Sequence, residues 1–286
     1  MKRGRRERSE RGGVNGYNAV MDAIDLFGVA KPVIAMLHVP ALPGSPQSAL
    51  SFHEVLDWVL SDAEKLASAG VHGWILENFG DAPFFPRSVP PHTVAFLTAI
   101  GYEVKRRFSL ALGINVLRND ALSAVAVACA VGAEFIRVNI HTGARLTDQG
   151  LIEGIAHETL RYRKMLGRDV KIFADVDVKH SAPVAARDLK DEVEELVSRA
   201  SADAVIVSGT GTGKPTDLGH LKTAKQAAGP APVFAGSGVD AANLNAVLNI
   251  ADGVIVGTAL KKDGVTTNPV DTERVLTLMQ SRRLHG

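Results

Sequence analysis

Residues 231–257, APVFAGSGVDAANLNAVLNIADGVIVG, contain the unit that decides the fold. The apolar run 231–236 predicts a strand that ends in glycine, and 252–257 predicts a second strand of the same kind. The segment between them, 240–249, has the periodicity of a helix. Two strands joined through a helix run parallel to each other, so this stretch is a βα unit of an α/β protein.

The same alternation extends back to residue 33 and forward to the C-terminus. We predict strands at 33–38, 72–77, 110–116, 134–140, 170–176, 203–208, 231–236 and 252–257, and helices at 52–70, 91–107, 120–131, 150–166, 186–200, 217–228, 240–249 and 270–282. About eight βα units in this length predict a (β/α)8 TIM barrel. A doubly wound open sheet is the alternative. The strand count without an antiparallel edge, and the polar residues that follow most strands, favour the barrel.

Composition limits the class of protein. The chain of 286 residues is 46% hydrophobic, has one cysteine, and has no apolar run near the roughly 20 residues that a membrane helix needs. We therefore expect a cytoplasmic protein without a membrane span. Residues 1–16 carry six Lys or Arg against two Glu, a net charge of +4, which leaves −3 for the rest. We predict a disordered basic arm at 1–20, a single barrel domain at 21–286, and no nucleic-acid partner.

Polar residues collect where the first five strands end, which in a barrel is the mouth that holds the active site. Arg137 and Asn139 share strand parity and so point the same way. The full set is His38, Glu77, Asn78, Asn115, Arg118, Asn119, Asp120, Arg137, Asn139, His141, Asp175, Asp177, Lys179 and His180. The residues expected to be catalytic are Glu77, Asn115, Arg137, Asn139, Asp175 and Lys179.

Several of these residues also have a structural explanation. Asp120 is placed to cap the helix after it, and Arg137 can form an ion bridge with Glu77 or Asp175. A divalent metal held by His38, Glu77, Asp175 and His180 is a further alternative, although no HxH or HExxH spacing supports it.

The last three strands end in small residues instead. Free backbone amides after strands seven and eight commonly hold a phosphate in barrels, and the helix expected at 240 would add its positive end. The residues predicted to bind phosphate are Gly209, Thr210, Gly211, Gly236, Ser237, Gly238, Gly257 and Thr258.

The segment 208–217, SGTGTGKPTD, looks like a P-loop but is not one. A P-loop needs Gly at the position of Ser208 and Ser or Thr at that of Pro215. We interpret it as one wall of the phosphate site, which favours a phosphorylated small molecule over a nucleoside triphosphate.

The chain also resembles a known family. The segments AMLHVPALPGSP (35–46), LENFGDAPF (76–84), GINVLRND (113–120), FIRVNIHTGARLTDQGLIEG (135–154) and ADVDVKHSAP (174–183) are similar to those of the BtpA/SgcQ family. The resemblance implies a barrel of the ribulose-phosphate-binding type. It also implies a link, in one branch, to photosystem I biogenesis, and it brings no settled reaction.

These observations lead to two functional hypotheses. The first is an enzyme, an isomerase or epimerase, a lyase or a nucleosidase-like hydrolase, acting on a phosphorylated sugar or nucleotide-derived metabolite. Asp175 or Glu77 would be the acid or base, and Arg137 would orient the substrate. Lys179 would stabilise developing negative charge; formation of a Schiff base by Lys179 is a less favoured alternative. The second is a non-catalytic binding or assembly factor. No cofactor beyond a possible divalent metal is expected, and a homo-oligomer stays open.

Overall fold

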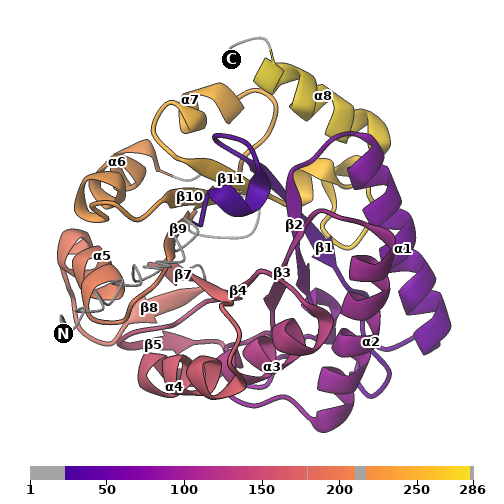
Figure 1. Ribbon diagram of the computed structural model, residues 1–286, viewed down its shortest axis with the longest axis horizontal. Helices are drawn as coiled ribbons and strands as arrows, with labels where there is room; N and C mark the ends of the chain where they lie inside the picture. The colour runs from indigo at the N-terminus through magenta and orange to yellow at the C-terminus, as the bar shows by residue number, and fades with distance from the viewer. Residues whose placement is uncertain (1–22, 179, 210–216, 284–286) are drawn as a thin grey trace, which may run out of the picture.

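The computed structural model of the protein describes residues 23–178, 180–209 and 217–283. Its parallel strands close into a barrel in the order β1-β11-β10-β9-β7-β4-β3-β2, with the helices outside (Figure 1). The strands are β1 Val33–His38, β2 Gly73–Glu77, β3 Ala111–Asn115, β4 Phe135–Val138, β7 Lys171–Val176, β9 Ala204–Ser208, β10 Val233–Gly236 and β11 Gly253–Val256. The closed sheet confirms the predicted barrel and rules out the open sheet.

The helices lie where the periodicity predicts them, with two exceptions. They are α1 Phe52–Ser68, α2 Pro91–Arg107, α3 Ala121–Val131, α4 Ala156–Leu166, α5 Leu189–Ser198, α6 Leu218–Ala227, α7 Leu244–Leu248 and α8 Thr272–Arg283. Local signals fix several ends. Ser51 and Glu54 form a capping box at the start of α1, and Gly132 ends α3 in the left-handed conformation. Asp120 caps α3, as expected from its position.

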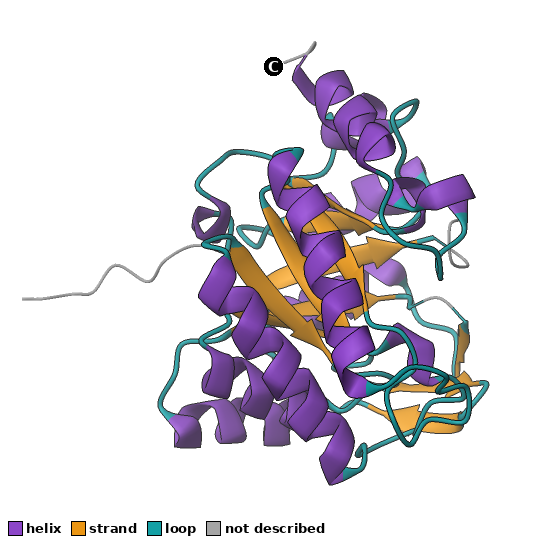
Figure 2. Cartoon of the chain, turned by 90° about the vertical axis from the view of Figure 1, so that its right-hand side faces the viewer, coloured by secondary structure: helices purple, strands orange, loops and turns teal. Residues whose placement is uncertain are grey.

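The first exception is the segment before α4, where a helix from 150 was predicted. The chain instead forms an antiparallel hairpin of β5 Ala144–Thr147 and β6 Gly150–Glu153, to which β8 Ser181–Pro183 adds a third strand. The turn is held by Thr147, whose hydroxyl accepts from the amide of Gln149, and by Gly150 at φ +92°. This small sheet lies beyond the carboxyl ends of the barrel strands (Figure 2).

The second exception is α7, which begins at Leu244 and not near residue 240. Asp240 uses its own carboxylate to accept the amides of Ala242 and Asn243, so the intervening residues form a turn. The prediction that a helix beginning at 240 points its positive end at the mouth is therefore wrong.

Aromatic rings fill the interior of the barrel at the end opposite the small sheet. Phe135 and Phe173 stack with ring centroids 4.4 Å apart, and Phe173 and Phe234 follow at 5.0 Å. Phe27, from the short 3-10 helix η1 Asp25–Phe27, meets all three edge-on. Glycines make the room, because a Cβ at Gly113 would lie 2.3 Å from the Phe135 ring. The barrel therefore has a closed floor, and only its other end is open to a ligand.

No helix among the described residues is long and apolar enough to cross a membrane.

The close packing of Gly113 against the Phe135 ring can be tested by substitution. Gly113→Ala should destabilise the protein by about 1–3 kcal/mol, because the new methyl group is forced into the Phe135 ring. Adding Phe135→Leu should restore part of the loss, since a smaller side chain relieves the overlap. Urea unfolding of the two single variants and the double variant measures this coupling, and additive losses would contradict the account.

Candidate functional site

The carboxylate of Asp175, on β7, organises a buried polar layer above the aromatic floor. It accepts two hydrogen bonds from Arg137, from Nε and Nη2, both at 3.0 Å. It also accepts from Asn139 Nδ2 at 2.8 Å and from Ser208 Oγ at 2.9 Å. The Asp175 side chain has no exposed surface. Its oxygens are therefore fully used in holding β4 and β9 to β7.

Arg137 forms an ion bridge with Asp175. This is the structural explanation that the sequence analysis offered for Arg137 beside a catalytic one. Burial alone would lower the pKa of Arg137, but the charge of Asp175 and the hydrogen bonds to it hold that pKa above its ordinary value. Asn115 supports the same layer from β3 by donating to the Arg137 carbonyl at 3.1 Å and to Asn139 Oδ1 at 3.3 Å. Arg137 and Asn139 thus have fixed positions, as a binding site requires.

Other polar residues at strand ends hold loops in place. Asn78 Oδ1 accepts the amide of Leu117 at 2.7 Å, and the Asn119 side chain bonds both the amide and the carbonyl of Ile140. Asp120 accepts the amide of Val89 in addition to capping α3. These three residues set the backbone around the mouth, which explains why they are polar and buried.

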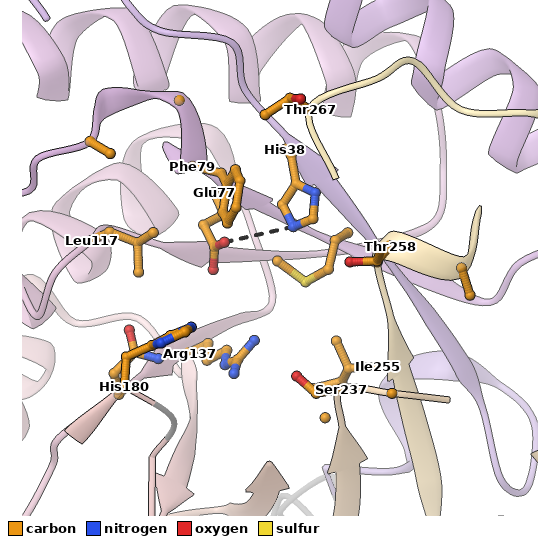
Figure 3. A pocket seen from close by; sticks show the side chains of 18 of the residues that line it. His38, Glu77, Phe79, Leu117, Arg137, His180, Ser237, Ile255, Thr258 and Thr267 are labelled. Atoms are coloured by element: carbon orange, nitrogen blue, oxygen red, sulfur yellow. Dashed lines mark ion pairs between the residues drawn. The ribbon is translucent and has the colours of Figure 1, made fainter. Parts of the chain in front are cut away.

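A cavity of about 710 Å³ opens above the polar layer at the mouth. Arg137 lines it from β4, Asn139 from just after β4, and Glu77 from β2. His38 and Met36 line it from β1. Figure 3 shows the Glu77 and Arg137 side chains pointing into the same space as Ser237 and Thr258. Asn115 and Asp175 do not line this cavity, so among the predicted catalytic residues that the structure describes, Glu77, Arg137 and Asn139 face it.

Glu77 and His38 form a pair on one wall of the cavity. Glu77 Oε1 lies 3.8 Å from His38 Nε2, and both side chains are almost entirely buried. The ring of Phe79 covers the imidazole, with centroids 4.7 Å apart. A largely buried carboxylate beside an imidazole on a cavity wall has the composition of a proton-transfer site.

The opposite wall is built from the loops after β10 and β11. Gly236 ends β10, Ser237 and Gly238 follow it, and Gly257 and Thr258 follow β11; all five line the cavity. Ser237 adopts φ 120°, a conformation that non-glycine residues rarely take. A Cβ at Gly257 would approach His38 Cε1 to 3.0 Å, so glycine keeps this wall clear. We name these five residues the cradle.

The loop after β11 is tied to the outside of the barrel. Lys261 Nζ donates to Asp62 Oδ2 of α1 at 2.7 Å, and Asp62 Oδ1 accepts the amide of Val270 at the same distance. Both charged side chains are buried. This pair fixes the loop that carries Thr258 and Thr267 into the cavity.

The structure adds residues that the sequence did not indicate. Arg274 of α8 and Asp148 at the hairpin turn both line the cavity, and so do Gln47 and Phe79. Arg274 is exposed and donates to the carbonyl of Ala259, beside the cradle. Arg274 has no signal in the sequence, because it lies in a helix that begins well beyond the strand end.

Arg118 lines the cavity as well, although it is only 5% exposed. Burial lowers the pKa of its guanidinium from the ordinary value, and the charges of Asp175, Asp148 and Glu77 act against that shift.

The remaining predicted positions are divided. Lys179, Thr210 and Gly211 lie outside the described residues, as does most of the SGTGTGKPTD segment. Gly209 is buried at the end of β9 and does not line the cavity, whereas His180 does.

Asp177 faces outward and pairs with Arg145 at 2.9 Å. His141 was expected at the mouth, and this is wrong: it packs outside the barrel, with Nε2 3.1 Å from the carbonyl oxygen of Ala200.

The predicted metal ligands are not brought together. Among the described residues, no three His, Cys, Asp or Glu side chains form a group that could hold a metal ion. His38 and Glu77 are neighbours, but Asp175 is occupied by Arg137.

Comparisons with solved structures agree on the fold. N-(5'-phosphoribosyl)anthranilate isomerase from Pyrococcus furiosus matches with a TM-score of 0.53 and 12% identity, over 89% of this chain and 99% of that one. KGPDC from Streptococcus mutans matches with a TM-score of 0.54 and 9% identity, over 90% and 100%. At these identities the likeness concerns the barrel alone.

Comparisons of sequence define the family. The model of the BtpA family matches residues 29–283. The Photosystem I biogenesis protein BtpA of a Synechocystis species is 44% identical over 261 residues, 91% of each chain. The putative sgc region protein SgcQ of Escherichia coli is 33% identical over 259 residues, 90% of this chain and 96% of that one. The chain therefore belongs to the BtpA family.

Proposed function

We propose that the protein is an enzyme that acts on a phosphorylated sugar or a nucleotide-derived metabolite, by isomerase, lyase or glycosidic-cleavage chemistry. One observation carries the proposal. A single cavity has a loop cradle suited to a phosphate on one wall and the Glu77–His38 pair on another. A substrate held at one wall by its phosphate presents its sugar carbons and oxygens to the other.

The cradle supplies the groups that a phosphate needs. Backbone amides after a strand and a serine or threonine hydroxyl donate to phosphate oxygens, and Ser237 and Thr258 supply such hydroxyls. Arg274 adds a positive charge at the rim. A helix dipole adds nothing to the cradle, because α7 has only five residues and the Asp240 carboxylate accepts the amides of Ala242 and Asn243 in the turn before it.

The opposite wall supplies the chemistry. Glu77 removes or returns a proton, and His38, within 3.8 Å, exchanges protons with it or with a substrate oxygen. Arg137 and Asn139, held by Asp175, donate to the oxygen on which negative charge develops. Asp175 itself is assigned a positioning role, because its oxygens already accept from Arg137, Asn139 and Ser208.

The name of one relative favours a second candidate, a non-catalytic role in assembling a membrane complex. Relatives that match over most of their length also occur in Pyrococcus furiosus, at 42% identity, and in Escherichia coli, at 33% identity. The names of these two relatives do not refer to that complex, so we keep the assembly role as the second candidate. The two candidates differ in whether Glu77→Gln removes the function.

A negative charge introduced into the cradle tests whether the cradle binds phosphate. Ribose 5-phosphate should raise the melting temperature of the protein, and Ser237→Asp should weaken its binding at least about tenfold, because a carboxylate then faces the phosphate. Ser61→Asp, the same change on the exposed side of α1, is the matched control and should behave like the unchanged protein. Thermal-shift titration measures the affinity of each variant for ribose 5-phosphate. Equal binding by the two variants would show that the phosphate does not bind at the cradle.

The acid–base pair and the positioning residue should respond differently to loss of charge. Glu77→Gln should keep the fold and ribose 5-phosphate binding but lower turnover at least about a hundredfold. Asp175→Asn should lower the free energy of unfolding by about 3–5 kcal/mol, because it leaves Arg137 buried without its counter-charge.

A panel of sugar phosphates and nucleoside monophosphates, followed by NMR for product formation, provides the turnover assay, and urea unfolding provides the stability. No consumption of any compound by the unchanged protein, or full activity of Glu77→Gln, would count against the enzyme and for the binding role.

A further inference from the structure

Arg118 is a buried charged residue at the mouth of the barrel to which the proposed reaction gives no role. It follows β3, lines the main cavity, and is only 5% exposed. An arginine in this position presents several N–H donors and a fixed positive charge to whatever enters the cavity.

The backbone that carries Arg118 is held in place on both sides. The amide of Arg118 donates to the carbonyl of Phe85 at 3.1 Å. Leu117, before it, exchanges hydrogen bonds with the side chain of Asn78. The side chain of Asn119, after it, is bonded to the backbone that follows β4. A guanidinium on such a segment is preorganised, so less conformational entropy is lost when a ligand binds to it.

The charge of Arg118 is only partly balanced by its surroundings. Burial lowers the pKa of its guanidinium; the carboxylates of Asp175, Asp148 and Glu77 act against that shift, and the charge of Arg137 adds to it. Asp175 already accepts two hydrogen bonds from Arg137, and Asp148 is exposed to solvent. An anion beside Arg118 would raise this pKa again and would give the buried charge a further counter-charge.

Arg118 lies across the barrel from the cradle. In the closed ring of strands, β3 and β4 are opposite β10 and β11 (Figure 1). Arg118 follows β3 and Arg137 lies in β4, whereas the cradle lies at the ends of β10 and β11. Glu77 and His38, on β2 and β1, come between these two positions. A ligand held by a phosphate in the cradle can therefore extend past the Glu77–His38 pair toward Arg118.

We propose that Arg118 binds a second anionic group of the substrate, a carboxylate or a phosphate at the end of the molecule remote from the cradle. A planar guanidinium matches both groups, since each offers two oxygens to parallel N–H donors. The inference rests on the proposed function, because the cradle fixes the first end of the ligand. It narrows the substrate class to phosphorylated sugar acids and sugar bisphosphates, and it sets aside nucleoside monophosphates, whose remote end is a neutral base.

The experiment compares ligands of the same chain length that differ at the remote end. Fructose 6-phosphate carries one phosphate, fructose 1,6-bisphosphate adds a second phosphate, and 6-phosphogluconate adds a carboxylate. Isothermal titration calorimetry measures the affinity of the protein for each. One of the two ligands with a second anion should bind at least about tenfold more tightly than fructose 6-phosphate. The tighter of the two identifies the second group as phosphate or carboxylate.

Substitution of Arg118 should remove this gain and nothing else. Arg118→Met removes the charge and keeps most of the side-chain volume, a change that buried ionic sites often tolerate. Its affinity for the tighter ligand should fall to that for fructose 6-phosphate, whose own binding should not change. Arg118→Lys keeps the charge but not the planar donors, so it should lose part of the gain with the fold intact. A residue with only a structural role would not separate the ligands in this way.

Arg274→Met is the matched control, because Arg274 is an exposed arginine that lines the same cavity beside the cradle. It should change the binding of all three ligands by the same factor. Ser237→Asp tests the cradle separately and should weaken all three.

The inference is overturned if the second anion adds no affinity in the unchanged protein, or if Arg118→Met weakens all three ligands equally. In both cases, binding of fructose 6-phosphate that is lost in Ser237→Asp would leave the proposed function standing. If the unchanged protein binds none of the three ligands, the cradle and the second anion site both fail.

Discussion

The pair of Arg137 and Asp175 is the interaction on which the mouth of the barrel depends. A guanidinium buried inside the sheet needs a counter-charge, and Asp175 provides it with two hydrogen bonds of 3.0 Å. The same carboxylate also accepts from Asn139 and Ser208, so one side chain aligns groups from three neighbouring strands. Without that carboxylate, the charged and amide side chains that face the cavity would have no fixed position.

The rest of the site is built in layers on this pair. Below it, the stacked phenylalanines and Phe27 close the barrel, which confines any ligand to the other end. Above it, Glu77 and His38 lie on strands that pair in register, His38 beside Glu77. The cradle sits on loops, but Asp62 and Lys261 anchor the one that carries Thr258. The groups that we propose to react therefore lie on paired strands, and the proposed phosphate site lies largely on loops, one of which is anchored.

Much of this arrangement could be predicted from the sequence. Strand parity correctly paired Arg137 with Asn139, and the position of Asp120 correctly indicated a helix cap. The partner of Arg137 could not be chosen from the sequence, because Glu77 and Asp175 both come near it only when β2, β3, β4 and β7 form the sheet. Arg274 and His141 illustrate the same limit: spacing along the chain does not show that a later helix reaches the mouth, or that the chain after β4 turns outward. The hairpin was not predicted, because helical periodicity was extended back to residue 150, where the chain forms β6, and no strand was expected at 144–147.

We propose that one cavity holds a phosphate at the cradle and presents the attached sugar to Glu77 and His38. A crystal structure of the protein with ribose 5-phosphate, or with a substrate found in the panel, tests it most directly. We expect the phosphate group between the loops after β10 and β11, with an oxygen within hydrogen-bond reach of Ser237 or Thr258, and the sugar directed toward Glu77. A ligand phosphate beside Arg118 and Arg137, with the cradle empty, would contradict it.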